Sequence, residues 1–112
     1  MTLYASILLT LAAAFGFTMI FIGLYYHRSS KKLAISHALL AITGFGFLGI
    51  QIYRGPVDKY NNSAALLLLL AVIGGGMLLA LREDNHSPSM PLVTIHAILA
   101  LAGLLVLILG LQ

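Results

Sequence analysis

The sequence contains no cysteine and no tryptophan, and only 8% of its 112 residues are charged. Without thiols the chain cannot form disulfides, cysteine-ligated metal or iron–sulfur sites, or a haem attached through thioethers. A soluble domain carries about 25% charged residues, so this chain cannot cover a water-facing surface. With 61% hydrophobic residues, it is predicted to be one membrane domain over residues 1–112, in contact with the lipid bilayer.

Acidic residues are also scarce. The chain has only Asp58, Glu83 and Asp84, and all three fall between the apolar segments. No carboxylate pair or nucleophile–base arrangement is therefore available, so no catalytic residue is assigned and a hydrolase or transferase is not expected. The net charge of +3 is spread over short loops, and no basic run is long enough to indicate nucleic-acid binding.

Four apolar segments follow one another, at residues 3–26, 33–53, 63–81 and 91–111. Each is long enough to cross a bilayer as a helix, which satisfies its own backbone hydrogen bonds in lipid. The first segment has no basic start and no small-residue cleavage site, so it is interpreted as a retained span. The sequence predicts an all-α membrane protein, a bundle of four transmembrane helices.

The charges of the connections predict the orientation. The first and third connections carry the cationic residues Arg28, Lys31, Lys32 and Arg82. The second carries Arg54 and Lys59. Because cytoplasmic loops hold an excess of Lys and Arg, we expect connections one and three in the cytoplasm and both termini outside. The expected location is a prokaryotic cytoplasmic (inner) membrane, and the oligomeric state, including a homodimer, stays open.

The chain matches itself at an offset of 59 residues. All four histidines pair at this offset, His27 with His86 and His37 with His96. Small residues follow the same offset in the pairs Ala12 and Ala71, Gly16 and Gly75, Ala41 and Ala100, and Gly44 and Gly103. The pattern indicates two tandem helical hairpins, at about 1–55 and about 60–112. Two spans per copy make them parallel repeats, related by an axis along the membrane normal.

Two histidines lie inside apolar segments, in the stretches SHALLAITG and IHAILALAG. His37 and His96 are each about five residues, or roughly 7 Å, from the start of their helix. The repeat predicts that they lie at equal depth and face each other across the bundle axis. Equal depth suits two axial ligands of one central atom.

The histidine face continues with small residues, because positions four and seven residues further on lie on the same side of a helix. These are Ala41 and Gly44 in one helix, and Ala100 and Gly103 in the other. Such strips permit close helix packing or form a slot for a flat ring. We expect a porphyrin whose apolar edge enters this slot and whose iron is held by both histidines. Its propionates would face the cationic residues of the same side, which are Arg28, Lys31, Lys32 and Arg82.

The segments SHALLAITGFGFLG and IHAILALAGLLVLI resemble the haem-binding helices of the cytochrome b561 superfamily and similar four-helix membrane cytochromes b. The resemblance implies haem b ligated by His37 and His96, and electron transfer with a quinone or a partner redox protein at the cytoplasmic side. Members commonly hold two b haems, one near each face. No histidine here lies near the extracytoplasmic face, so one haem is expected. A second would depend on His27 and His86.

Two other functions fit the histidines. In a small metal-ion or proton-coupled transporter or channel, all four would bind an ion or relay protons, although no acidic residue lies in a span to accompany a cation. In a structural or assembly subunit, His37 and His96 would only hydrogen-bond neighbouring helices. For His27 and His86 the options are an interfacial polar residue, contact with propionates, ligation of a second haem, or a proton or quinone site.

Overall fold

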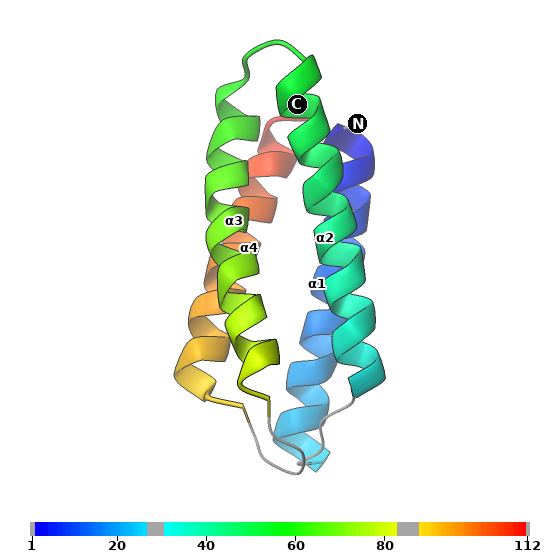
Figure 1. Cartoon of the computed structure of the whole chain (residues 1–112), viewed down its shortest axis with the longest axis vertical. Coiled ribbons are helices and arrows are strands. Elements are labelled where there is room, and N and C mark those ends of the chain that lie inside the picture. Colours follow the sequence, from blue (N-terminus) through cyan, green and yellow to red (C-terminus); the bar gives the residue numbers. More distant parts are fainter. Residues whose placement is uncertain (1, 27–30, 83–87, 112) are drawn as a thin grey trace.

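A computed structural model describes residues 2–26, 31–82 and 88–111. They form four helices, α1 (Thr2–Tyr26), α2 (Lys31–Arg54), α3 (Lys59–Ala80) and α4 (Met90–Leu109). The helices run antiparallel in a bundle of 46 × 22 × 21 Å (Figure 1). Each has 20 to 25 residues and is long and apolar enough to cross a membrane. The predicted four-helix transmembrane bundle is confirmed, and the chain is a multi-pass membrane protein.

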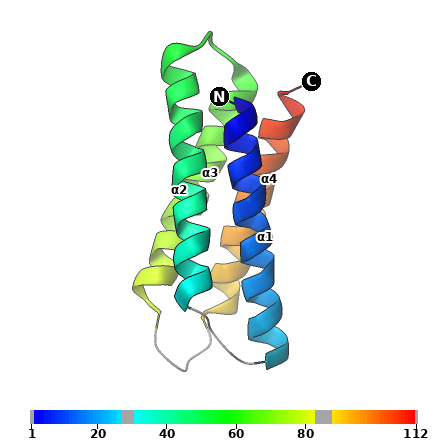
Figure 2. The ribbon, with the colours of Figure 1, turned by 90° about the vertical axis from the view of Figure 1, so that its right-hand side faces the viewer.

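The helices are arranged around a central axis in chain order. α1 packs mainly on α2 and α3 mainly on α4, while the two hairpins meet through α2 and α3 and through α1 and α4 (Figure 2). α2 and α4 are therefore diagonal to each other across the axis. The start of α1 and the end of α4 lie at one end, beside the α2–α3 connection, and the end of α1, the start of α2, the end of α3 and the start of α4 lie at the opposite end (Figure 1).

α3 starts further ahead of its predicted apolar segment than the other three helices do. α3 begins at Lys59, four residues before the predicted start, because Asp58 caps it. The carboxylate of Asp58 accepts hydrogen bonds from the backbone N–H groups of Tyr60 (2.8 Å) and Asn61 (3.2 Å). These bonds satisfy two of the donors that a helix leaves open at its first turn. Polar residues thus form the first turn of a helix that hydropathy alone detects only later.

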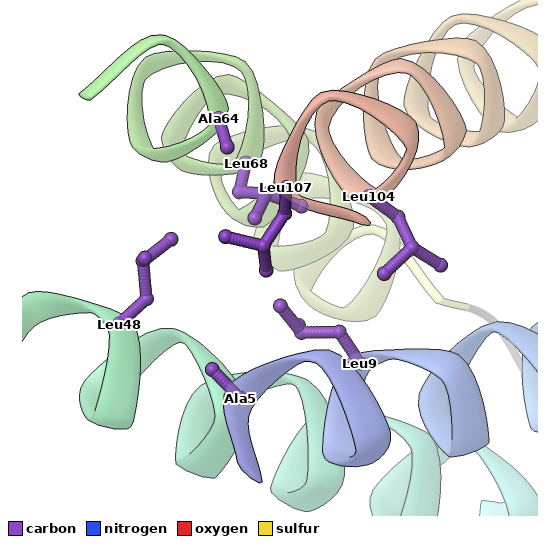
Figure 3. Packing of buried hydrophobic residues seen from close by; sticks show 7 residues of the cluster. All are labelled: Ala5, Leu9, Leu48, Ala64, Leu68, Leu104 and Leu107. Carbon is purple, nitrogen blue, oxygen red and sulfur yellow. The ribbon is translucent and has the colours of Figure 1, made fainter. Parts of the chain in front are cut away.

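Leucine and alanine side chains fill the half of the bundle near the termini. Leu48 and Leu107 are fully buried there, and they are equivalent at the 59-residue offset. Figure 3 shows the side chains of the two hairpins converging in this core. Its buried members are Ala5, Leu9, Leu48, Ala64, Leu68, Leu104 and Leu107. We call this part, residues 2–12, 44–54, 59–71 and 103–109, the closed half.

The other half of the bundle is packed differently. Among the described residues, α1 and α3 have no buried residue beyond Ala12 and Ala71, and α2 and α4 have none before Gly44 and Gly103. Every described side chain in this half is exposed or half-buried. We call this part, residues 13–26, 31–43, 72–80 and 90–102, the open half. The boundary lies at equivalent residues of the two hairpins.

Candidate functional site

The two intramembrane histidines lie together in the open half. His37 comes from α2 and His96 from the diagonal helix α4, and their imidazole centroids are 6.1 Å apart. The ring planes are nearly perpendicular, at 84°. Both side chains are half-buried. The structure therefore brings together the two residues that the sequence predicts to face each other at equal depth.

Each imidazole is held by a backbone carbonyl of its own hairpin. Nδ1 of His37 lies 2.6 Å from the carbonyl oxygen of Ala12, and Nδ1 of His96 lies 2.7 Å from that of Ala71. A carbonyl oxygen only accepts, so Nδ1 must donate in both bonds. In a neutral imidazole the lone pair is then on Nε2. Histidines that ligate metals characteristically donate their other N–H group in this way.

Glycines of α1 and α3 lie directly against the rings. A Cβ atom placed on Gly16 would be 3.2 Å from Cε1 of His37, and one placed on Gly75 would be 2.9 Å from Cε1 of His96. The repeat pairs these two glycines in the sequence but does not connect them with the histidines. The available signal was the repeat, since Gly16 and Gly75 are equivalent at the same offset as the two histidines.

The slot expected beside the histidines needs a correction. A Cβ atom on Gly44 would lie 2.9 Å from Cγ of Leu9, and one on Gly103 would lie 2.8 Å from Cγ of Leu68. The space next to both glycines is therefore occupied by leucines of the neighbouring helix, and the slot is closed at this depth. Ala41 and Ala100 are equivalent in the two hairpins and lie one turn further along the helix than the histidines. Both are half-buried.

The cationic candidates lie at the end of the bundle to which the open half extends. Lys31 and Lys32 are exposed in the first turn of α2, and Arg82 is half-buried just after α3. The other candidates of this end, His27, His86 and Arg28, lie outside the described residues. Positive charge is thus present on the side where propionates are expected, within a helical turn or two of the imidazoles.

The two histidines are too few ligands for a bare metal ion, so they favour a metal centre that brings ligands of its own. Within the described ranges, no group of three or more His, Cys, Asp or Glu side chains could hold a metal ion. Two opposed axial imidazoles have their centroids about 6 Å apart, given a metal–nitrogen bond of about 2 Å and about 1 Å from nitrogen to ring centre. The observed 6.1 Å fits this spacing. Haem iron takes four ligands from the porphyrin and needs only two from the protein, so the number and kind of donors fit haem.

Comparisons of the chain with protein-family models, curated protein sequences and solved structures found no match. The resemblance to the cytochrome b561 superfamily accordingly rests on the two histidine-containing helices.

Proposed function

We propose that the protein is a membrane-embedded haem b protein that transfers electrons, with His37 and His96 as the axial ligands of one haem. The observation that carries this proposal is the pair of imidazoles from diagonal helices, with ring centroids 6.1 Å apart and with both Nδ1 atoms engaged by carbonyls. Both Nε2 atoms therefore keep a lone pair for a metal. The pair lies in the half of the bundle in which none of the described residues is fully buried.

Haem, when bound, supplies a one-electron redox centre, and the protein tunes it through ligands, hydrogen bonds and burial. The Ala12 and Ala71 carbonyls make the imidazoles stronger metal ligands by accepting hydrogen bonds from their Nδ1–H groups. Leucines of the closed half, such as Leu48 and Leu107, exclude water from the opposite side. His37 and His96 are each six positions after the first residue of their helix, so the shorter path for electrons leads to the Lys31 end of the bundle.

The partner at that end is a quinone or a redox protein. The charge of the connections supports a cytoplasmic position for this end, with both termini extracytoplasmic, in a prokaryotic inner membrane. One haem per chain is proposed, because the described residues contain one facing histidine pair. A second haem on the same side would require His27 and His86.

A second candidate is a structural or assembly subunit, and the hydrogen bonds of the histidines favour it. His37 connects α2 to α1, and His96 connects α4 to α3. Buried polar groups in lipid commonly bind helices together in this way. This role needs only the donated N–H group, so glutamine or asparagine could replace histidine, whereas neither could ligate haem iron in place of imidazole.

The test is an absorption spectrum of detergent-purified protein from cells supplied with haem, recorded oxidised and dithionite-reduced, with pyridine haemochrome quantification. Sharp α and β bands on reduction, lost in both His37→Gln and His96→Gln, are the expected result. His27→Ala and His86→Ala serve as controls, and a haem-to-protein ratio near one that they leave unchanged assigns a single haem.

Retention of low-spin haem in the His37→Gln/His96→Gln double variant would defeat the proposal. A haem-free wild-type protein would also defeat it. In that case, stable folding of the glutamine variants would favour the structural role, and metal- or pH-dependent flux in vesicles would favour the transporter.

A further inference from the structure

We infer that Gly16 and Gly75 are positioning residues that hold the imidazoles of His37 and His96 in the Nδ1–H form by letting each ring lie against a helix backbone. The inference deepens the proposed function and rests on it for its relevance to haem. The geometry itself involves only residues of this chain.

Each glycine is one turn after the residue whose carbonyl binds the imidazole. In an α-helix, the carbonyl of residue i accepts the N–H group of residue i+4, so the Ala12 oxygen also faces the N–H of Gly16. A carbonyl oxygen has two lone pairs and can take a second donor. The imidazole of His37 uses this capacity at 2.6 Å. Ala71 and Gly75 bear the same relation to His96, at 2.7 Å.

To reach that oxygen, the ring must lie against the turn that the glycine closes. The first atom of any side chain at Gly75 would come within 2.9 Å of Cε1, 3.5 Å of Nδ1 and 3.6 Å of Nε2 of His96. Separations below 3.0 Å are not found for real Cβ atoms, so the ring would have to move. At Gly16 the nearest ring atom would be 3.2 Å away, which is a milder conflict.

The run Gly74–Gly75–Gly76 contains its own controls. A Cβ atom on Gly74 would lie 3.6 Å from Cβ of His96, an ordinary contact, and one on Gly76 would meet nothing within 4 Å. Only the middle glycine conflicts with the ring. Alanine is a better helix former than glycine at all three positions, so loss of helix propensity cannot explain a defect confined to Gly75→Ala.

Displacement of the His96 ring would also change which ring nitrogen carries the proton. Once Nδ1 of His96 leaves the Ala71 carbonyl, the proton is free to move to Nε2, and an Nε2–H imidazole cannot ligate through that nitrogen. Gly75 therefore acts through His96 by keeping the proton on the nitrogen that faces α3. The same holds for Gly16 and His37. The two glycines are thus matched parts of one arrangement, repeated in the two hairpins.

The test is ¹⁵N NMR of histidine-labelled, haem-free protein in detergent, which distinguishes protonated from unprotonated ring nitrogens. His37→Gln and His96→Gln assign the signals. The wild-type protein should show a protonated Nδ1 and a bare Nε2 at both histidines. Gly75→Ala should lose this pattern at His96 and keep it at His37, while Gly74→Ala and Gly76→Ala keep both. Gly16→Ala should shift His37 in the same direction by a smaller amount.

An unchanged His96 pattern in folded Gly75→Ala would overturn the inference, as would an Nε2–H form in the wild-type protein. If Gly75→Ala does not fold, the milder Gly16→Ala decides in its place. Because the protein is haem-free, the outcome is separate from the proposed function. If both histidines show a protonated Nδ1 and an unprotonated Nε2 but the protein never binds haem, only the proposed function is refuted. If the protein binds haem but the histidines lack this pattern, only this inference is refuted.

A second readout applies to the haem-loaded protein. The reduction potential of Gly75→Ala should be higher than that of Gly76→Ala, since an imidazole without its carbonyl partner stabilises ferric iron less. Equal potentials in the two variants would contradict the positioning role. A purely structural role for Gly75 would alter stability and leave the potential unchanged.

Discussion

The contact between Gly44 and α1 predicts a large difference between two glycines of the same helix. A Cβ atom on Gly44 would lie 2.9 Å from Cγ and 3.1 Å from Cδ2 of Leu9, and 3.2 Å from Cβ of Leu8. Carbon atoms pack best at about 3.5–4.0 Å, so α1 and α2 must separate by several tenths of an ångström. The Cβ of Leu8 moves only with its backbone, which limits how far a rotamer change can relieve the conflict.

Overpacking of this kind costs about 1–3 kcal/mol. Replacing a helical glycine by alanine returns roughly 0.5–1 kcal/mol through backbone entropy. Gly44→Ala should therefore lower the free energy of unfolding by a net amount of about 1 kcal/mol. Gly46 faces nothing within 4 Å, so Gly46→Ala receives only the entropic gain. The difference between the two variants isolates the overpacking cost, at about 1–3 kcal/mol.

The assay is SDS titration of the protein in mixed micelles, with helicity followed by circular dichroism. Equal unfolding midpoints for Gly44→Ala and Gly46→Ala would refute the packing of α1 on α2 described above. A double-mutant cycle sharpens the test, because Gly44→Ala should cost less in a Leu9→Ala background than in the wild type. Part of the cost should remain there, since Leu8 keeps its Cβ.

Two further predictions concern the ends of the bundle. Asp58→Ala should lower the free energy of unfolding by about 0.5–2 kcal/mol by removing the cap of α3, and the Tyr60 amide should exchange its hydrogen faster. Asp58→Asn should retain most of this protection from exchange. Unchanged exchange in Asp58→Ala contradicts the cap. The chain has no cysteine, so Val57→Cys (Val57 is 93% exposed) and Ser89→Cys can each be labelled singly with a membrane-impermeant maleimide. The two should react from opposite sides of the membrane, Ser89→Cys from the cytoplasm, and labelling of both from one side contradicts the bundle topology.

Hydropathy and the repeat predicted much of the fold. Continuous apolar runs admit only helices in lipid, so helix number and approximate bounds followed from the sequence. The start of α3 did not, because capping by Asp58 is a local hydrogen-bond effect that an average over apolar residues does not detect. The repeat placed His37 and His96 at equal depth, and their rings are 6.1 Å apart.

The surroundings of the histidines were harder to predict. The periodicity of one helix shows which residues share a face, but it does not show which neighbour occupies that face. Gly44 shares the face of His37 in the sequence pattern, yet Leu9 of the hairpin partner fills the space beside it. Counted along α1 and α2 from the connection between them, Gly16 lies within about one helical turn of the depth of His37. The rotation of α1 that directs Gly16 toward the ring depends on side-chain packing between helices.

The position of the imidazole layer also determines how the membrane voltage acts on it. His37 and His96 are each six positions after the first residue of their helix, or about 9 Å along the axis. That is roughly a third of a hydrocarbon core of about 30 Å. The free energy of a unit charge that crosses the whole membrane changes by about 2.3 kcal/mol per 100 mV. For a charge that reaches the imidazoles from the near face, the free energy therefore changes by only about 0.7 kcal/mol per 100 mV. A charge arriving through the leucines of the closed half would gain or lose about twice as much. For the proposed haem, the voltage dependence of the redox equilibrium would therefore report the face from which the electron came.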